Sequence, residues 1–213
     1  MSYNAILFDL DGTLTDSGEG ITKSVKPALE YFGIQVNSLD ELRFFVGPPL
    51  RDSFIRCGIP EDQVEEAIRI YRQRYVPIGI FENHPYPGIR EMLKTLRDRG
   101  YRLFVATSKP ESMALAVLDR FELSQYFEEI CGATLDKSRD SKSAVIAYLL
   151  EKIGGADHAV MVGDTAFDVI GAREHGIPTI GVSWGYGSVD EMQKSGAAAI
   201  AVTVEALMEM LQK

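Results

Sequence analysis

The chain has 213 residues, and its 31 Asp and Glu outnumber its 22 Lys and Arg, which gives a formal net charge of −9. This length is enough for one complete hydrophobic core together with a small second domain. Because an acidic protein is repelled by a polyanion, the charge argues against a nucleic acid polymer as partner.

The sequence carries no recognisable membrane or export signal. No apolar segment approaches the roughly 20 residues that a membrane-spanning helix needs, and the N-terminus lacks the basic and apolar regions of a signal peptide. The two cysteines, Cys57 and Cys131, show no paired spacing, which is typical of reduced thiols. We therefore predict a cytoplasmic protein that does not associate with membranes.

The first predicted element is a buried strand at residues 5–10, since a short, continuous apolar segment is typical of a strand covered on both faces. Asp9 and Asp11 close this strand, ahead of a turn at Gly12 and Thr13. Side chains two positions apart in an extended chain point the same way. Neighbouring carboxylates repel each other, so this pair indicates a bound cation, an acid/base pair, or both.

Residues 17–83 are predicted to form a helical domain inserted after this strand. Four stretches have helical character, namely residues 20–32, 38–45, 50–57 and 61–75, and no strong strand pattern interrupts them. About 65 residues are too many for an ordinary loop. We therefore divide the chain into an α/β core domain, residues 1–16 and 84–213, and an inserted helical domain, residues 17–83, with hinges near residues 16–17 and 83–86.

Beyond residue 86, strand and helix patterns alternate. Predicted strands cover residues 101–106, 159–162 and 178–182, and predicted helices cover residues 88–99, 110–121, 143–153 and 167–174. Such alternation indicates right-handed βαβ units. We predict an α/β fold with a Rossmann-like parallel sheet, in which ligands bind beyond the carboxyl ends of the strands.

Candidate phosphate ligands follow the second predicted strand. Thr107 and Ser108 lie directly ahead of a predicted helix, where hydroxyls and backbone amides can bind phosphate oxygens. Lys142 opens a later helix, although a cation is unfavourable toward the helix dipole at that end. A bound anion would explain its position, and Lys137 and Arg139 are alternatives for the same role.

Two more acids follow the strand at residues 159–162. Asp164 ends that strand, and Asp168 lies four residues further on, one helical turn away. Carboxylate oxygens are the hard ligands that Mg²⁺ prefers, usually with water and substrate phosphate completing its shell. We therefore expect these acids to meet those of the first strand around Mg²⁺.

With these residues in this order, the sequence resembles the haloacid dehalogenase superfamily. Residues 9–13 match that family's first motif and residues 163–168 its fourth, while Thr107 and Lys142 occupy the second and third. The inserted helical domain resembles the family's α-helical cap. Its segment at residues 46–51 resembles a cap segment of the phosphoglycolate phosphatase-like and nucleotidase-like enzymes. The resemblance implies a Mg²⁺-dependent phosphatase that acts on a small phosphorylated metabolite through an aspartyl-phosphate.

The resemblance also implies a role for each motif residue. Asp9 is the expected nucleophile. Asp11 is the expected acid that protonates the leaving alcohol, and then the base that activates water. Thr107, together with Ser108, is expected to hold the phosphoryl group, and Lys142 to offset the negative charge around it.

Metal ligands and a substrate contact complete the implied site. The expected ligands of Mg²⁺ are the side chains of Asp9, Asp164 and Asp168, the last directly or through water. The backbone carbonyl of Asp11 is expected to add a further ligand. Arg51, in the cap, suits a second anionic group on the substrate by bidentate pairing. Phosphoglycolate, a nucleoside monophosphate and a sugar phosphate all fit these expectations.

Other functions on the same fold are distinguished by single residues. Haloacid dehalogenases proper lack an acid two positions after the nucleophile, so Asp11 argues against that reaction. A β-phosphoglucomutase-like phosphotransferase shares the cap and Asp11, and a non-catalytic regulatory or binding protein could keep the same fold. Both alternatives stay open, and no sequence pattern indicates the oligomeric state.

Overall fold

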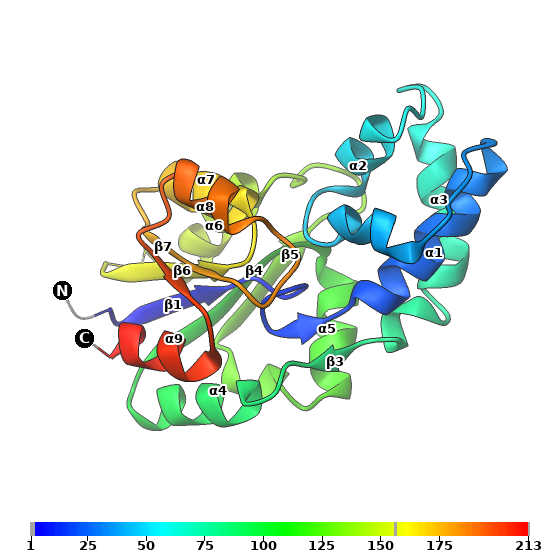
Figure 1. Ribbon diagram of the computed structural model, residues 1–213. Helices are drawn as coiled ribbons and strands as arrows, with labels where there is room; N and C mark the ends of the chain where they lie inside the picture. Colours follow the sequence, from blue (N-terminus) through cyan, green and yellow to red (C-terminus); the bar gives the residue numbers. More distant parts are fainter. Residues whose placement is uncertain (1–2, 156, 213) are drawn as a thin grey trace.

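The computed structural model describes residues 3–155 and 157–212, and its centre is a six-stranded sheet (Figure 1). All strand pairs in this sheet are parallel, and the order is β5-β4-β1-β6-β7-β8. The strands are β1 (Ala5–Phe8), β4 (Arg102–Pro110), β5 (Glu129–Ala133), β6 (Ala159–Gly163), β7 (Thr179–Val182) and β8 (Ala199–Ala201). The predicted α/β fold with a Rossmann-like parallel sheet is thus confirmed.

The apolar run of β1 is explained by burial on both faces. Ile6 and Phe8 belong to one hydrophobic cluster, whereas Ala5 and Leu7 belong to a second. Successive side chains of a strand point to opposite faces, so each cluster lies on its own side of the sheet. A strand of this kind needs an apolar residue at every position, which is the pattern that predicted it.

Helices cover the two faces. One cluster takes side chains from α6 (Lys142–Ile153) and α7 (Ala166–Arg173), and the other from α4 (Ile89–Asp98), α5 (Glu111–Arg120) and α9 (Val204–Leu211). Figure 1 shows these two layers above and below the sheet, with α8 (Val189–Lys194) beside α7. Four of these helices were predicted from their spacing, and α8 and α9 were not.

Strand β4 is longer than predicted. It continues through Thr107, Ser108 and Lys109 to Pro110, and its pairing with β5 is irregular between Thr107 and Pro110. An irregularity of this kind bends a strand and re-aims its side chains. The residues expected to lie in a loop after the strand are therefore held by the sheet itself.

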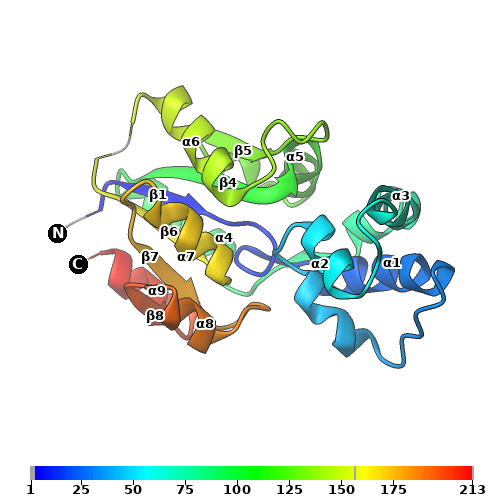
Figure 2. The same ribbon diagram turned by 90° about the horizontal axis from the view of Figure 1, so that it is seen from above.

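A separate group of helices lies beyond one end of the sheet (Figure 2). Its members are α1 (Gly18–Tyr31), η1 (Leu39–Phe45), α2 (Leu50–Arg56), α3 (Val64–Tyr75) and η2 (Gly79–Phe81). These helices pack on one another, α1 against both α3 and η1, around buried Val25, Leu29, Phe45 and Phe54. We call this group the cap; its standing as a domain distinct from the rest stays a prediction.

Two short strands connect the cap to the sheet. β2 (Thr15–Asp16) pairs antiparallel with β3 (His84–Pro85), so the two segments predicted as hinges lie side by side. Within the described ranges, 3–155 and 157–212, none of the helices has the length and apolar character that a membrane crossing requires.

Candidate active site

Three acids meet at the carboxyl ends of two neighbouring strands. Asp9 directly follows β1, and its backbone N–H donates to the Val162 carbonyl of β6 at 2.9 Å. Asp164 directly follows β6, so strand pairing brings the two acids together. Asp168 joins them from the first turn of α7, where its carboxylate accepts hydrogen bonds from the Thr165 backbone N–H (3.0 Å) and hydroxyl (2.8 Å).

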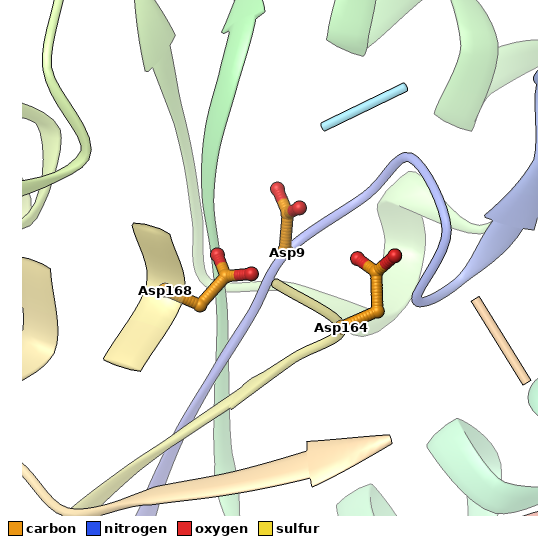
Figure 3. A group of neighbouring side chains, drawn as sticks. All are labelled: Asp9, Asp164 and Asp168. Atoms are coloured by element: carbon orange, nitrogen blue, oxygen red, sulfur yellow. The ribbon is translucent and has the colours of Figure 1, made fainter. Parts of the chain in front are cut away.

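These acids form a compact, buried group (Figure 3). Asp9, Asp164 and Asp168 each offer a carboxylate oxygen, and these oxygens all lie within 4.8 Å of one another. Burial raises the pKa of Asp9 to about 6, against the attraction of Lys142. Burial, with repulsion from Asp168 and Asp9, raises the pKa of Asp164 well above its ordinary value. A hard divalent cation such as Mg²⁺ would relieve this repulsion, so the donor set fits that ion.

Lys142 is the cation beside this group. Its Nζ lies 2.8 Å from Asp9 Oδ1 and 2.8 Å from Asp168 Oδ1, and it donates to the Ala106 carbonyl at 3.0 Å. Burial opposes its charge, yet attraction to Asp168 and Asp9 is stronger, so the pKa of Lys142 is raised. These contacts explain why a lysine stands at the start of α6 despite the unfavourable helix dipole. Its ammonium neutralises two buried carboxylates.

The two alternative cations lie elsewhere. Lys137 forms an ion pair with Glu65 of the cap. Arg139 pairs with Glu111 at 2.8 Å and donates to the Gly132 carbonyl at 2.7 Å. Of the three candidates from the sequence, Lys142 is the one that reaches the carboxylate group.

The loop after β7 holds Asp164, a contact that sequence reasoning missed. The Tyr186 backbone N–H donates to Asp164 Oδ2 at 2.8 Å, and the Thr13 hydroxyl donates to Oδ1 at 3.2 Å. Trp184 Nε1 donates to the Thr13 carbonyl at 3.1 Å, which ties this loop to the turn after β1. The glycine-rich sequence around Trp184 was the available signal, since glycines at a strand end permit close backbone approach.

Gly12 is required by the same packing. Its φ is +85°, and a Cβ at this position would lie 2.3 Å from Asp164 Oδ2. A side chain here would be both strained and in collision with a predicted metal ligand.

Thr107 and Ser108 lie on the irregular end of β4. Thr107 is almost fully buried, and its hydroxyl accepts a hydrogen bond from the Lys109 backbone N–H at 3.2 Å. The Ser108 hydroxyl is buried and has no hydrogen-bond partner among the residues that the structure describes. Buried hydroxyls are nearly always paired, so an oxygen of a bound substrate would satisfy Ser108.

Asp11 points to a different partner from the other acids. Lys109 Nζ donates to its Oδ1 at 3.1 Å and to its Oδ2 at 2.9 Å. The Asp11 side chain is accordingly absent from the three-carboxylate group within the described part of the chain. Lys109 was not singled out in the sequence, although it directly follows the candidate phosphate ligands.

A family model described as haloacid dehalogenase-like hydrolase matches residues 6–182. The chain belongs to the haloacid dehalogenase-like hydrolase family. The resemblance of its motifs to that superfamily is thereby confirmed.

Proteins similar to this chain carry different names. A 5'-nucleotidase of Pseudomonas aeruginosa is 41% identical over 214 residues, which cover 100% of this chain and 97% of the relative. The tyrosine-protein kinase PtkA of Mycobacterium tuberculosis is 43% identical over 213 residues, which cover 99% of this chain and 73% of the relative. The crystal structure of a predicted phosphatase from Clostridium acetobutylicum is 45% identical, with a TM-score of 0.96 and 99% of both chains covered.

A cavity in this hydrolase lies between the cap and the strand ends. Its volume is about 300 Å³, and Lys142, Ser108, Arg51 and Arg72 are among its lining residues. Arg51 is paired within the cap, with Glu61 at 2.8 Å and Glu65 at 3.6 Å. Both partners of Arg51 are cap residues, and among the described residues Arg51 forms no ion pair with a predicted catalytic residue. In the described part of the chain, the cavity reaches the buried acids only through Lys142, which contacts Asp9, and its wall carries both basic residues and the acids Asp52, Glu65 and Asp140.

Proposed function

We propose that the chain is a magnesium-dependent phosphatase that hydrolyses a small phosphomonoester through a phosphorylated Asp9. The observation that carries this proposal is the position of the Lys142 ammonium, 2.8 Å from both Asp9 and Asp168 beside a third buried carboxylate. Membership of the haloacid dehalogenase-like hydrolase family supports the same chemistry.

The reaction has two steps. Asp9 Oδ attacks the phosphorus, the bond from phosphorus to the alcohol oxygen breaks, and Asp11 gives that oxygen a proton. Water then attacks the phosphorus of phospho-Asp9, Asp11 takes the proton of the water, and inorganic phosphate leaves. Asp9 is regenerated as a carboxylate.

Phosphoryl transfer depends mainly on positioning and charge neutralisation. Lys142 offsets the charge of Asp9 and of the phosphoryl group, and the hydroxyls of Thr107 and Ser108 orient the phosphoryl oxygens. The residues that would hold Mg²⁺ are Asp9, Asp164 and Asp168, with the Asp11 backbone carbonyl. When bound, Mg²⁺ supplies further positive charge to the phosphoryl oxygens.

The substrate is a small phosphorylated metabolite. The cavity volume of about 300 Å³ favours a compact ester, and the arginines of its wall can pair with a second anionic group where the ester carries one. Arg51 and Arg72 are our proposed contacts for that second group. The relative named 5'-nucleotidase supports a nucleoside monophosphate among the candidates, beside phosphoglycolate and a sugar phosphate. The cytoplasm stays the proposed location, which the free thiols of Cys57 and Cys131 support.

A direct assay tests this proposal. Purified protein is incubated with p-nitrophenyl phosphate, with Mg²⁺ in one sample and EDTA in the other. We expect phosphate release that requires Mg²⁺ and is lost in Asp9→Asn. The matched control is Asp119→Asn, because Asp119 is an exposed residue of α5. Wild type that releases no phosphate would refute the proposal and favour a non-catalytic binding protein.

A phosphotransferase is the second candidate. It would use the same phospho-Asp9 but pass the group to an acceptor other than water, as in a β-phosphoglucomutase-like reaction. The 43% identity to a protein named tyrosine-protein kinase favours keeping this alternative. The assay that separates them follows labelled phosphate from the ester, and counts release into water against transfer to an added sugar phosphate or tyrosine peptide.

A further inference from the structure

The Asp11 carboxylate contacts the buried ammonium of Lys109 and lies outside the group formed by the other three acids. Both its oxygens accept from Lys109 Nζ, at 3.1 Å and 2.9 Å. The Lys109 side chain is 4% exposed and the Asp11 side chain 9% exposed. A buried charge must be fully paired to be tolerated, so the surroundings of Lys109 determine where the Asp11 carboxylate lies.

The third partner of Lys109 comes from the cap. Lys109 Nζ donates to the hydroxyl of Tyr75 and lies 4.9 Å from the centroid of its ring. Tyr75 is the last residue of α3 and is 2% exposed. A lysine ammonium has three N–H donors, and the two Asp11 oxygens with the Tyr75 oxygen provide three acceptors.

This chain of contacts borders a small cavity under the cap. The cavity has a volume of about 70 Å³, and Asp11, Ser108, Lys109 and Tyr75 are among the residues that line it. Asp11 and Lys109 come from the sheet, whereas Tyr75 comes from the cap. The orientation of the Asp11 carboxylate toward this cavity therefore depends on where α3 sits.

We propose that Tyr75 is a positioning residue that acts through Lys109, orienting the Asp11 carboxyl for proton transfer to the leaving alcohol when α3 is docked. The inference rests on the proposed function, because it takes Asp11 as the acid. Movement of α3 away from the sheet would remove one acceptor of Lys109 and leave the Asp11 carboxyl less firmly oriented. The cap would thus contribute to proton transfer without touching the phosphoryl group.

The test compares two leaving groups in Tyr75→Phe. p-Nitrophenolate leaves without a proton, whereas an alkoxide needs one, so only the alkyl ester depends on a well-placed acid. General acid catalysis contributes about 10²–10⁴-fold. For loss of orientation alone we expect kcat/KM to fall about tenfold for the alkyl phosphate that wild type hydrolyses fastest, and only about two- to threefold for p-nitrophenyl phosphate. kcat/KM reports the steps up to release of the alcohol, so slow hydrolysis of phospho-Asp9 does not mask the difference.

Tyr71→Phe is the matched control. The Tyr71 ring stacks on Tyr75, with centroids 4.9 Å apart, and Tyr71 is also buried on α3. Removing its hydroxyl should change kcat/KM for both esters by less than about twofold. Equal losses for the two esters in Tyr75→Phe would overturn the proposal, because a packing defect affects both alike. No loss for the alkyl ester would overturn it as well. Wild type that hydrolyses neither ester would instead contradict the proposed function.

Discussion

The Lys142 ammonium lies 2.8 Å from Asp9 Oδ1, and both side chains are 3% exposed. A second carboxylate, Asp168, lies at the same distance from Lys142. The site thus contains a lysine that neutralises two acids, one of which is the predicted nucleophile. Removing Lys142 would leave the buried charges of Asp9 and Asp168 uncompensated. Both the stability of the fold and the activity should therefore depend on Lys142.

Lys142→Met should lower the free energy of unfolding by about 3–5 kcal/mol, because Asp9 and Asp168 would lose their buried counter-charge. Phosphatase activity should fall by about 10²–10³-fold, since a preorganised positive charge at the phosphoryl group is lost. Urea unfolding and Mg²⁺-dependent hydrolysis of p-nitrophenyl phosphate measure the two effects. Lys137→Met is the control, because its pair with Glu65 is exposed and is worth about 0–1 kcal/mol. An equal loss of activity in Lys137→Met would mean that the site cation has been assigned to the wrong residue.

Asp9 should make the stability of the metal-free protein depend on pH. Its pKa is raised from 3.8 to about 6, chiefly by burial, so the folded state binds this proton more tightly than the unfolded state. The protonated Asp9 therefore contributes fully to the free energy of unfolding below pH 3.8, and this contribution is lost as the pH rises through about 6. The loss amounts to roughly 3 kcal/mol.

Mg²⁺ should reverse this trend, because it competes with the proton for Asp9. The increase in Tm on adding Mg²⁺ should be larger at pH 7 than at pH 5, and Asp9→Asn should remove most of that difference. Thermal unfolding at the two pH values, with Mg²⁺ and with EDTA, measures it. An increase in Tm that is the same at both pH values would exclude Asp9 as the titrating ligand.

The elements that sequence reasoning predicted best have strong local patterns. β1 and β6 are continuous apolar runs because helices cover both faces of the sheet at these strands. β5 and β8 were missed, since β5 opens with Glu129 and β8 consists of Ala199, Ile200 and Ala201. Both strands lie at edges of the sheet, where their side chains are incompletely buried. In addition, the alanines of β8 have little intrinsic preference for strands.

In the candidate site, too, sequence reasoning located the residues with a local pattern and missed the contacts between distant residues. Acids that directly follow buried strands could be located, because parallel strands end at one edge of the sheet. The contact of Lys109 with Asp11 spans 98 positions, and that of Lys109 with Tyr75 spans 34. No local pattern encodes such contacts, because the first arises only when β1 and β4 pair in the sheet and the second only when the cap packs against the sheet.

Gly12 should be the least replaceable glycine among those with positive φ. In Gly12→Ala the new Cβ would lie 2.3 Å from Asp164 Oδ2, in addition to adopting a φ of +85°. Gly33→Ala is the matched control, since its φ is +78° and nothing lies within 4 Å of the added Cβ. We expect Gly33→Ala to cost about 1–2 kcal/mol from backbone strain alone.

Gly12→Ala should cost more than Gly33→Ala and should also abolish the Mg²⁺-dependent increase in Tm, because Asp164 would be displaced. Urea unfolding and thermal unfolding with Mg²⁺ measure these effects. If the two variants lost the same stability and both kept the Mg²⁺ effect, the contact between Gly12 and Asp164 would be unimportant for the metal site.

The two cavity arginines should differ in their effect on substrate selection. Arg51 is already paired with Glu61 and Glu65, whereas Arg72 has no ion pair among the residues that the structure describes. An unpaired guanidinium has its full charge available for a substrate anion. Arg72→Ala should therefore raise KM about tenfold or more for esters that carry a second anionic group, with kcat changed less. A lost hydrogen bond to a charged group is worth about 1.5–3 kcal/mol, which sets this scale.

Arg51→Ala should raise the same KM by a smaller factor, because Glu61 and Glu65 compete for its guanidinium. p-Nitrophenyl phosphate, which has no second anionic group, should show little change in KM with either variant. Steady-state kinetics with both ester classes measure these values. A larger effect from Arg51 than from Arg72 would mean that substrate binding breaks the Arg51 pairs, and would leave Arg51 as the main contact for the second anionic group.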